Sequence, residues 1–190
     1  MIRMEQPSFC FNSVDIGWPG YKMWKTVTGW EGMTPIQLAA EVMSANLLSI
    51  GIFGCSLRNI ILNSHGFAAG LHIGGVHHHD DSIEKKPMYE TDLGVFRSLK
   101  PFNVGTIWLV SGKAARGQYF CRTLANVTGT QVIASDGPQE VTAWQAIQLV
   151  AAGRSFIDDY EGNVFAFTPD GAMRRIDPEK DIRTVQESRW

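Results

Sequence analysis

Apolar positions in this chain follow two rhythms that alternate along the sequence. Three short runs are almost continuously apolar and rich in β-branched side chains, at 57–62, 106–110 and 131–135. Runs of this kind, bounded by glycine and polar residues, are typical of buried strands. Because their burial is continuous rather than alternating, they favour a parallel sheet that is covered on both faces.

A helix is predicted to begin at Thr34 and to end near Gly51. Thr34 can cap it, Pro35 suits the first helical position, and Gln37 stands where a capping box places Glu or Gln. Apolar residues then recur at helical spacing, which supports the helix: Ile36, Ala39, Ala40, Met43 and Leu47.

Three further helices are predicted between and after the strands. A short one covers 92–99 and stops before Lys100-Pro101, because the residue before proline disfavours the helical region. A second covers 117–127, with Gly129 placed as a C-terminal cap, and a third covers 140–152.

The remaining segments are predicted to be irregular or antiparallel. Residues 1–33 are expected to form short strands and loops packed on the domain, and 66–87, rich in Gly and His, to be mostly loop. The segment 155–178 is predicted to hold a terminal hairpin, because the turn composition of 168–171 separates two apolar runs.

The alternation of strand and helix predicts an α/β fold, a three-layer α/β/α sandwich with a mainly parallel central sheet, over one domain, 1–190. Ligands of such sheets bind at the carboxyl ends of the strands. Two predicted loops lie at that edge, 63–75 after the first core strand and 111–117 after the second.

Composition narrows the classes of function. The net charge of -2 does not indicate a surface that binds nucleic acid. No run is expected to reach the roughly 20 apolar residues of a membrane span. The N-terminus lacks the apolar core of a signal peptide. Three widely spaced cysteines argue against a disulfide framework and a zinc knuckle, so a cytoplasmic protein without a cofactor is expected.

His65, in the sequence Ser64-His65-Gly66, is the leading candidate for chemistry. It directly follows a predicted buried strand, which would hold its imidazole at a cleft, and its near-neutral pKa class suits acid-base work. Gly66 would allow a tight turn and could present its N–H to an oxyanion. The alternative is a loop histidine without a role.

This pattern resembles the caspase-like cysteine peptidase superfamily, above all its bacterial CHAT-type and caspase-hemoglobinase branches. The resemblance covers about 55–137 and rests on Ser64-His65-Gly66, on Phe67 to Gly75, and on Val132-Ile133-Ala134-Ser135. It implies a caspase-like fold, a histidine base at His65, and a nucleophilic cysteine after the strand 106–110. It also implies that the edge after Ser135 helps to form a specificity pocket, where Asp136 could attract a basic side chain.

The chain departs from this family at the nucleophile. Ser111-Gly112 stands where the cysteine belongs, so Gly112 replaces it, or Ser111 serves as nucleophile after a shift of one residue. A serine would need His65 as its base. Cys121 lies ten residues further on, in a predicted helix beside Phe120, and is expected to belong to the core.

Other clusters carry weaker hypotheses. His77, His79 and Asp81 are candidate metal ligands, although neighbouring residues on an extended chain point in opposite directions and a solvated loop is the simpler interpretation. Asp136 can equally be an ordinary turn residue, and Asp158 and Asp159 are expected to lie on a solvated face.

Three hypotheses follow. The first is a caspase-like domain without its nucleophile, a non-catalytic binding or regulatory module for a protein or peptide ligand, with no nucleic-acid or membrane partner. The second is an active peptidase-like hydrolase that uses Ser111 and His65. The third is a metal-binding protein built on the loop from His72 to Asp81.

Overall fold

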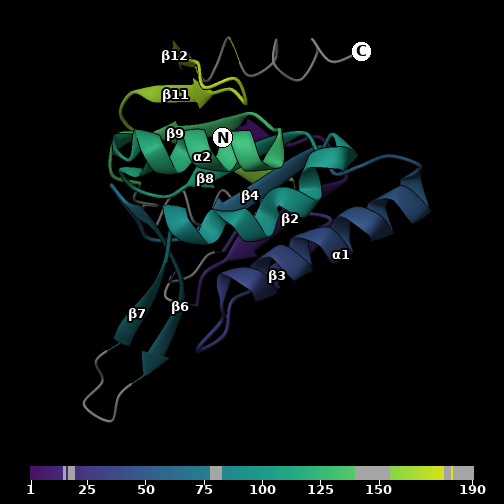
Figure 1. Ribbon diagram of the computed structural model, residues 1–190, viewed down its shortest axis with the longest axis horizontal. Coiled ribbons are helices and arrows are strands. Elements are labelled where there is room, and N and C mark those ends of the chain that lie inside the picture. The colour runs from purple at the N-terminus through teal and green to yellow at the C-terminus, as the bar shows by residue number, and fades with distance from the viewer. Residues whose placement is uncertain (15, 17–19, 78–82, 140–154, 178–180, 182–190) are drawn as a thin grey trace.

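A seven-stranded, mostly parallel sheet forms the centre of the protein in the computed structural model (Figure 1). The structure describes residues 1–14, 16, 20–77, 83–139, 155–177 and 181, with the backbone alone over 75–77 and 83–86. Five strands are parallel, and the last two are antiparallel. In spatial order the strands are β12 (Met173–Ile176), β11 (Val164–Phe167), β9 (Val132–Ser135), β8 (Thr106–Val110), β4 (Asn59–Asn63), β2 (Ser8–Asn12) and β3 (Lys25–Thr28).

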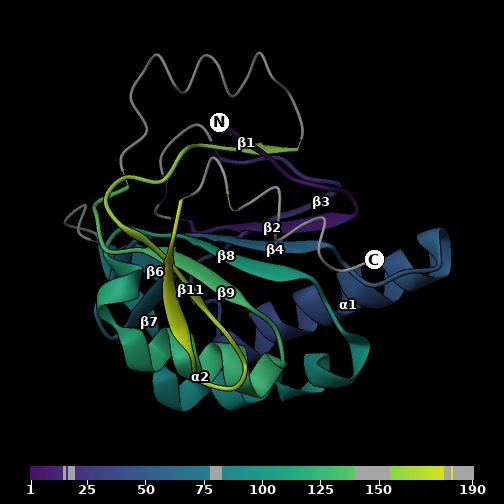
Figure 2. The ribbon, with the colours of Figure 1, turned by 90° about the horizontal axis from the view of Figure 1, so that it is seen from above.

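The helices of the described chain cover one face of this sheet, as Figure 2 shows. They are α1 (Pro35–Phe53), the 3-10 helix η1 (Glu90–Phe102) and α2 (Gln118–Thr128), preceded by the 3-10 turn η2 (Ala114–Arg116). The opposite face carries a small antiparallel pair, β1 (Ile2–Arg3) and β10 (Phe156–Ile157).

Successive side chains of each strand point to opposite faces of the sheet, and both faces are buried. Leu62 and Leu109 belong to the core under the helices. Ile61 and Trp108 belong to the core on the other face, and the Trp108 indole N–H donates to Asn59 Oδ1 at 2.8 Å. This double burial explains why the core strands are continuously apolar in the sequence.

The predicted α/β class and its mainly parallel sheet are confirmed, as are the three core strands and the helix 117–127. The short helix predicted over 92–99 is a longer 3-10 helix, which runs through Pro101 instead of stopping before it. The predicted helix 140–152 falls outside the described residues. The second helical layer of the expected sandwich therefore stays a prediction.

The prediction that 66–87 is mostly loop was wrong. This segment forms a three-stranded antiparallel sheet of β5 (Gly66–Phe67), β6 (Gly70–His77) and β7 (Ile83–Tyr89). β6 and β7 project from the body of the protein in Figure 1. Leu71 and Ile73 are buried at alternate positions, but the surrounding glycines and histidines hide this strand pattern in the sequence.

The segment 1–33 was expected to pack on the domain, yet its strand β2 lies inside the central sheet. β2 pairs in parallel with both β3 and β4, and all five of its residues are buried. Phe9 and Phe11 belong to the core under the helices, and Cys10 belongs to the opposite core. The run Ser-Phe-Cys-Phe-Asn holds no β-branched residue, so its strand character is weak in the sequence.

The start of α1 is as predicted, and the helix ends at Phe53, two residues beyond Gly51. Thr34 caps the helix in a capping box with Gln37, and Gly54 ends it in the left-handed conformation, beyond the expected Gly51. The buried residues are Leu38, Ala39, Val42, Ala45, Asn46 and Ser49, whereas Ile36 and Leu47 are exposed.

The expectation that no run is long and apolar enough to span a membrane does not hold for one helix. α1 passes that test by length and composition, and only 33% of it is buried in the structure. This is weak evidence for a membrane, because core helices of soluble proteins pass the same test.

Replacing Thr34 by alanine is expected to lower the free energy of unfolding by about 1 kcal/mol, because the Gln37 N–H loses its side-chain acceptor. Thr34→Ser keeps the oxygen and serves as the control. Urea denaturation of both variants measures the effect, and equal stability of Thr34→Ala and the wild type would show that this cap contributes nothing.

Candidate functional site

A buried row of polar side chains lies at the carboxyl edge of the parallel sheet. The register aligns Asn12, Asn63 and Val110 across three neighbouring strands. The Asn63 amide donates to Asn12 Oδ1 at 2.8 Å, and one residue further along the two chains the hydroxyls of Ser64 and Ser111 lie 3.0 Å apart. These hydrogen bonds satisfy polar groups that are removed from water, and they hold the strand ends together.

The ends of β4 and β8 also touch through their backbones. A Cβ on Gly66 would lie 2.6 Å from the carbonyl oxygen of Gly112 and 2.9 Å from the Cβ of Ser111. No side chain fits such a gap, so position 66 requires glycine for this approach. The Ser64-His65-Gly66 and Ser111-Gly112 segments, 47 residues apart in the chain, therefore meet directly.

Ser111 points into the protein and not toward His65. Its side chain is fully buried, and its hydroxyl contacts Ser64 Oγ and the Leu62 carbonyl at 3.3 Å. His65, by contrast, is exposed. A hydrolytic serine must reach both its base and solvent, so this placement counts against the serine-nucleophile hypothesis.

The described cysteines do not take over the role of nucleophile. Burial raises the pKa of the Cys121 thiol to about 12, and Cys121 Sγ contacts the Ala114 carbonyl, which agrees with the core role expected for it. Cys10 is fully buried, which also raises its pKa. Cys55 precedes β4 and lies at the end of that strand opposite to His65. Buried thiols with raised pKa values are poor nucleophiles.

Gly112 is half-buried at the edge that His65 occupies. Its backbone lies outside the left-handed region, so its conformation does not demand glycine. A Cβ there would face the backbone nitrogen of Gln139 at 3.2 Å, a tight but not prohibitive distance. The next residue, Lys113, adopts a left-handed conformation and donates its N–H to the Gly137 carbonyl.

Ser135 and Asp136 hold the loop before β11. Ser135 is fully buried, and its hydroxyl donates to the Glu161 carbonyl and accepts from the Gly137 N–H. Both carboxylate oxygens of Asp136 accept hydrogen bonds from Asn163. Ser135 therefore has no access to a ligand, and the specificity role expected for Asp136 stays a prediction beside this structural one.

A pocket of about 530 Å³ opens beside the loop that follows His65. Its lining combines two exposed tyrosines, Tyr89 and Tyr119, with the carboxylate of Glu90 and the guanidinium of Arg116. The rest of the lining is Ala68, Ala69, Thr91, Gly117, Gln118 and Phe120. Neither tyrosine stood out in the sequence, because Tyr89 ends the unpredicted strand β7, and Tyr119, on the predicted helix α2, joins the pocket only through the fold.

The metal hypothesis stays untested. His79 and Asp81 fall outside the described residues, and the side chain of His77 is not described either. His72 is the first residue of the segment in which a metal site was predicted. Its ring packs against the ring of Phe67, with the two centroids 4.9 Å apart. Within the described residues, no group of three or more metal-ligating side chains is found.

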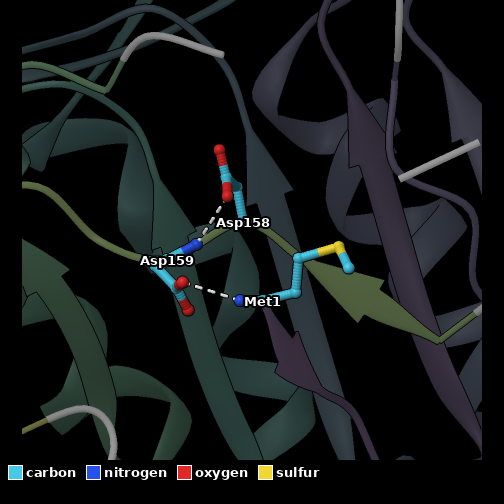
Figure 3. A network of polar contacts seen from close by, with 3 residues as sticks. All are labelled: Met1, Asp158 and Asp159. Atoms are coloured by element: carbon cyan, nitrogen blue, oxygen red, sulfur yellow. Dashed lines mark hydrogen bonds and ion pairs between the residues drawn. The ribbon is translucent and has the colours of Figure 1, made fainter. Parts of the chain in front are cut away.

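The acidic turn after β10 is only partly solvated, which corrects the expectation for Asp158. Figure 3 shows the Met1 amine paired with Asp159 Oδ2 at 2.6 Å, and the Asp159 N–H bonded to Asp158 Oδ1 at 2.9 Å. Asp158 is buried, and its burial raises the pKa of its carboxyl. This network fastens the N-terminus to the sheet face that lacks α1, η1 and α2.

Gly66→Ala is expected to lower the free energy of unfolding by about 1–3 kcal/mol, because the new methyl group collides with the Ser111-Gly112 turn. Gly94→Ala is the matched control, since a Cβ there meets nothing within 4 Å. Chemical denaturation of both variants decides the matter. Equal stability of the two would contradict the direct backbone contact.

Asp136→Asn is expected to destabilise the protein near neutral pH and to lose this effect in acid. Hydrogen bonds from the Asn163 side chain and backbone, helped by the charges of Arg116 and Arg175, hold the pKa of Asp136 below its ordinary value of 3.8. The stabilisation is therefore complete above that pH and disappears as the pH falls through the lowered pKa. Urea unfolding at pH 7 and pH 3 should show the gap narrowing, and a constant gap would rule out this linkage.

The geometry of the site is all that points to a function. A comparison with protein-family models finds no match for this chain, and a comparison with curated protein sequences finds none either. The resemblance to caspase-like peptidases therefore rests on the short motifs of the sequence alone, above all on Ser64-His65-Gly66 and Val132-Ile133-Ala134-Ser135. What the structure shows is an α/β fold with a mainly parallel sheet and a histidine just past the carboxyl end of one of its strands.

Proposed function

We propose that this protein is a caspase-like or CHAT-like domain that has lost its nucleophile and acts as a non-catalytic module for binding a protein or peptide. The observation that carries the proposal is the contact of the 64–66 segment with the 111–112 segment. Together with the register of the two strands that precede these segments, it supports an alignment of His65 with position 112.

The pairing follows from the twofold periodicity of strands. Asn63 is aligned with Val110, and the contact of Ser64 with Ser111 continues that register by one residue. Because successive residues of an extended chain point to opposite sides, we expect the next pair, His65 and Gly112, to turn away from the buried serines. The family resemblance implies this arrangement for the base and the nucleophile, with the CH2–SH group of the cysteine replaced by the hydrogen atom of Gly112.

The pocket beside this edge supports a role in binding. Its wall at Gly117 packs on the carbonyl of Ala68, so the pocket lies against the same loop that His65 begins. Two tyrosines, a carboxylate and a guanidinium offer both apolar contact and hydrogen bonds of either polarity. A peptide, with its alternating amide groups and side chains, suits such a mixed surface.

Gly112→Cys tests the assignment of the nucleophile position. The new thiol is expected to react with iodoacetamide at neutral pH at least about tenfold faster than the buried native cysteines, because it lies at the exposed edge. Adding His65→Ala should slow this reaction and shift its pH profile, since a nearby imidazolium lowers a thiol pKa. Gly94→Cys, on η1, is the control whose rate His65→Ala leaves unchanged.

Two results would overturn the proposal. One is a Gly112→Cys variant whose new thiol reacts no faster than the buried cysteines, because position 112 would then not face the edge. The other is hydrolysis of fluorogenic peptides by the wild-type protein that His65→Ala abolishes, since the domain would then be an enzyme.

Binding is tested by selection of a random peptide library displayed on phage. Enriched peptides are expected, and Tyr119→Ala should weaken them at least about fivefold, because this side chain is 79% exposed at the pocket. Trp30→Ala removes another exposed aromatic side chain outside the pocket and serves as the control. Equal loss in both variants, or no enrichment, would contradict peptide binding at this pocket.

A further inference from the structure

The solvent-facing side of α1 is apolar along its whole length. Ile36 is 65% exposed, Leu47 53%, Leu48 47% and Ile52 60%. These residues lie on the side of the helix opposite to Leu38, Val42, Ala45 and Ser49, which pack toward the sheet. A surface helix normally carries polar and charged residues there, so this face marks an interaction site.

The face is also free of charge and shallow at its centre. The exposed residues between the four large side chains are Gln37, Ala40, Ser44 and Gly51. Glu41 is the one charged residue of α1, and it is half-buried. A central line of small residues flanked by large aliphatic ones lets another helix approach closely.

A membrane is the less suitable partner for this face. Helices that lie on membranes usually carry Lys or Arg beside their apolar face, and α1 has neither. Spanning a bilayer would require the other side of α1 to leave the sheet, where Asn46 accepts from the Leu57 N–H and Ser49 donates to the Cys55 carbonyl.

We propose that α1 pairs with α1 of a second copy of this chain in an antiparallel, twofold-symmetric dimer. An axis beside Ser44 sets Ala40 against Leu48 of the second copy, so that a small residue meets a large one, and it brings Ile36 to the same level along the helix as Ile52 of the second copy. The same surface then serves both partners, as a twofold interface requires.

Charge selects the antiparallel orientation. In a parallel pair the two Glu41 carboxylates would lie side by side, whereas the antiparallel pair separates them by about six residues, about 9 Å along the helix axis. The exposed parts of Ile36, Leu47, Leu48 and Ile52 amount to on the order of 500 Å² per copy, so the pair buries about 1,000 Å² in total, at the lower end of specific interfaces. We therefore test for dissociation constants in the micromolar range, about 1–100 μM.

Sedimentation equilibrium of the full chain between about 1 and 200 μM tests the dimer. The wild-type mass should rise from monomer to dimer over this range. Leu48→Glu and Ala40→Lys should each raise the dissociation constant at least about tenfold, because they bury an unpaired charge. Ser98→Glu, which adds the same charge at an exposed position of η1, should change it less than about twofold.

The double variant Ala40→Lys with Leu48→Glu decides the orientation. In the antiparallel pair it sets Lys against Glu twice, and it should recover dimerisation at low salt. A wild-type protein that stays monomeric at about 200 μM would overturn the proposal. So would a protein that floats with neutral phosphatidylcholine vesicles through this face, since that outcome assigns α1 to a membrane.

Discussion

The register between β4 and β8 is the constraint on which the site depends. It brings the segments around residues 64 and 111 together although they are 47 residues apart in the chain. Parallel strands pair only after a long crossover connection, and here that connection contains the β5–β7 sheet and η1. A slip of one residue would exchange the buried serines with the exposed His65 and the half-buried Gly112. Ser64, Ser111 and Gly66 hold the strands against such a slip, the first two by a hydrogen bond and the third by lacking a side chain.

This constraint divides the edge of the sheet into an inner and an outer row. Asn12, Asn63, Ser64 and Ser111 form the inner row, where buried hydrogen bonds satisfy one another and leave no group for chemistry. His65 and Gly112 form the outer row, next to the loop that borders the pocket. A serine of the inner row is thus a structural residue, however close it stands to the histidine in the sequence motif. The absence of a side chain at position 112 is the feature that separates this edge from that of a cysteine peptidase.

The sequence predicted the elements that neighbouring residues identify, such as apolar runs and helix caps. It missed those that depend on contacts between distant segments. The continuous apolar runs identified β4, β8 and β9, and the capping box identified the start of α1. β2 did not stand out because its run is short and ends in asparagine, which is depleted in strands, although its two phenylalanines favour one. β6 was taken for a loop because it is rich in glycine. The structure shows that glycine is needed there for close contacts, such as that of Gly70 with the Met88 carbonyl. The candidate site followed the same division: His65 stood out at a strand end, whereas Tyr89 and Tyr119 meet only after folding.

α1 shows why an apolar pattern alone does not tell which face of a helix is buried. The helix carries two apolar stripes, one through Leu38, Val42 and Ala45 and one through Ile36, Leu47 and Ile52. The sheet covers the first stripe together with Asn46 and Ser49, whose side chains bond the chain leading into β4. Burying those polar groups in place of Leu47 and Leu48 leaves about 1–2 kcal/mol of apolar burial unused at each leucine. The hydrogen bonds that direct the chain into β4 therefore decide the orientation of the helix, and the second stripe is left to a partner outside this chain.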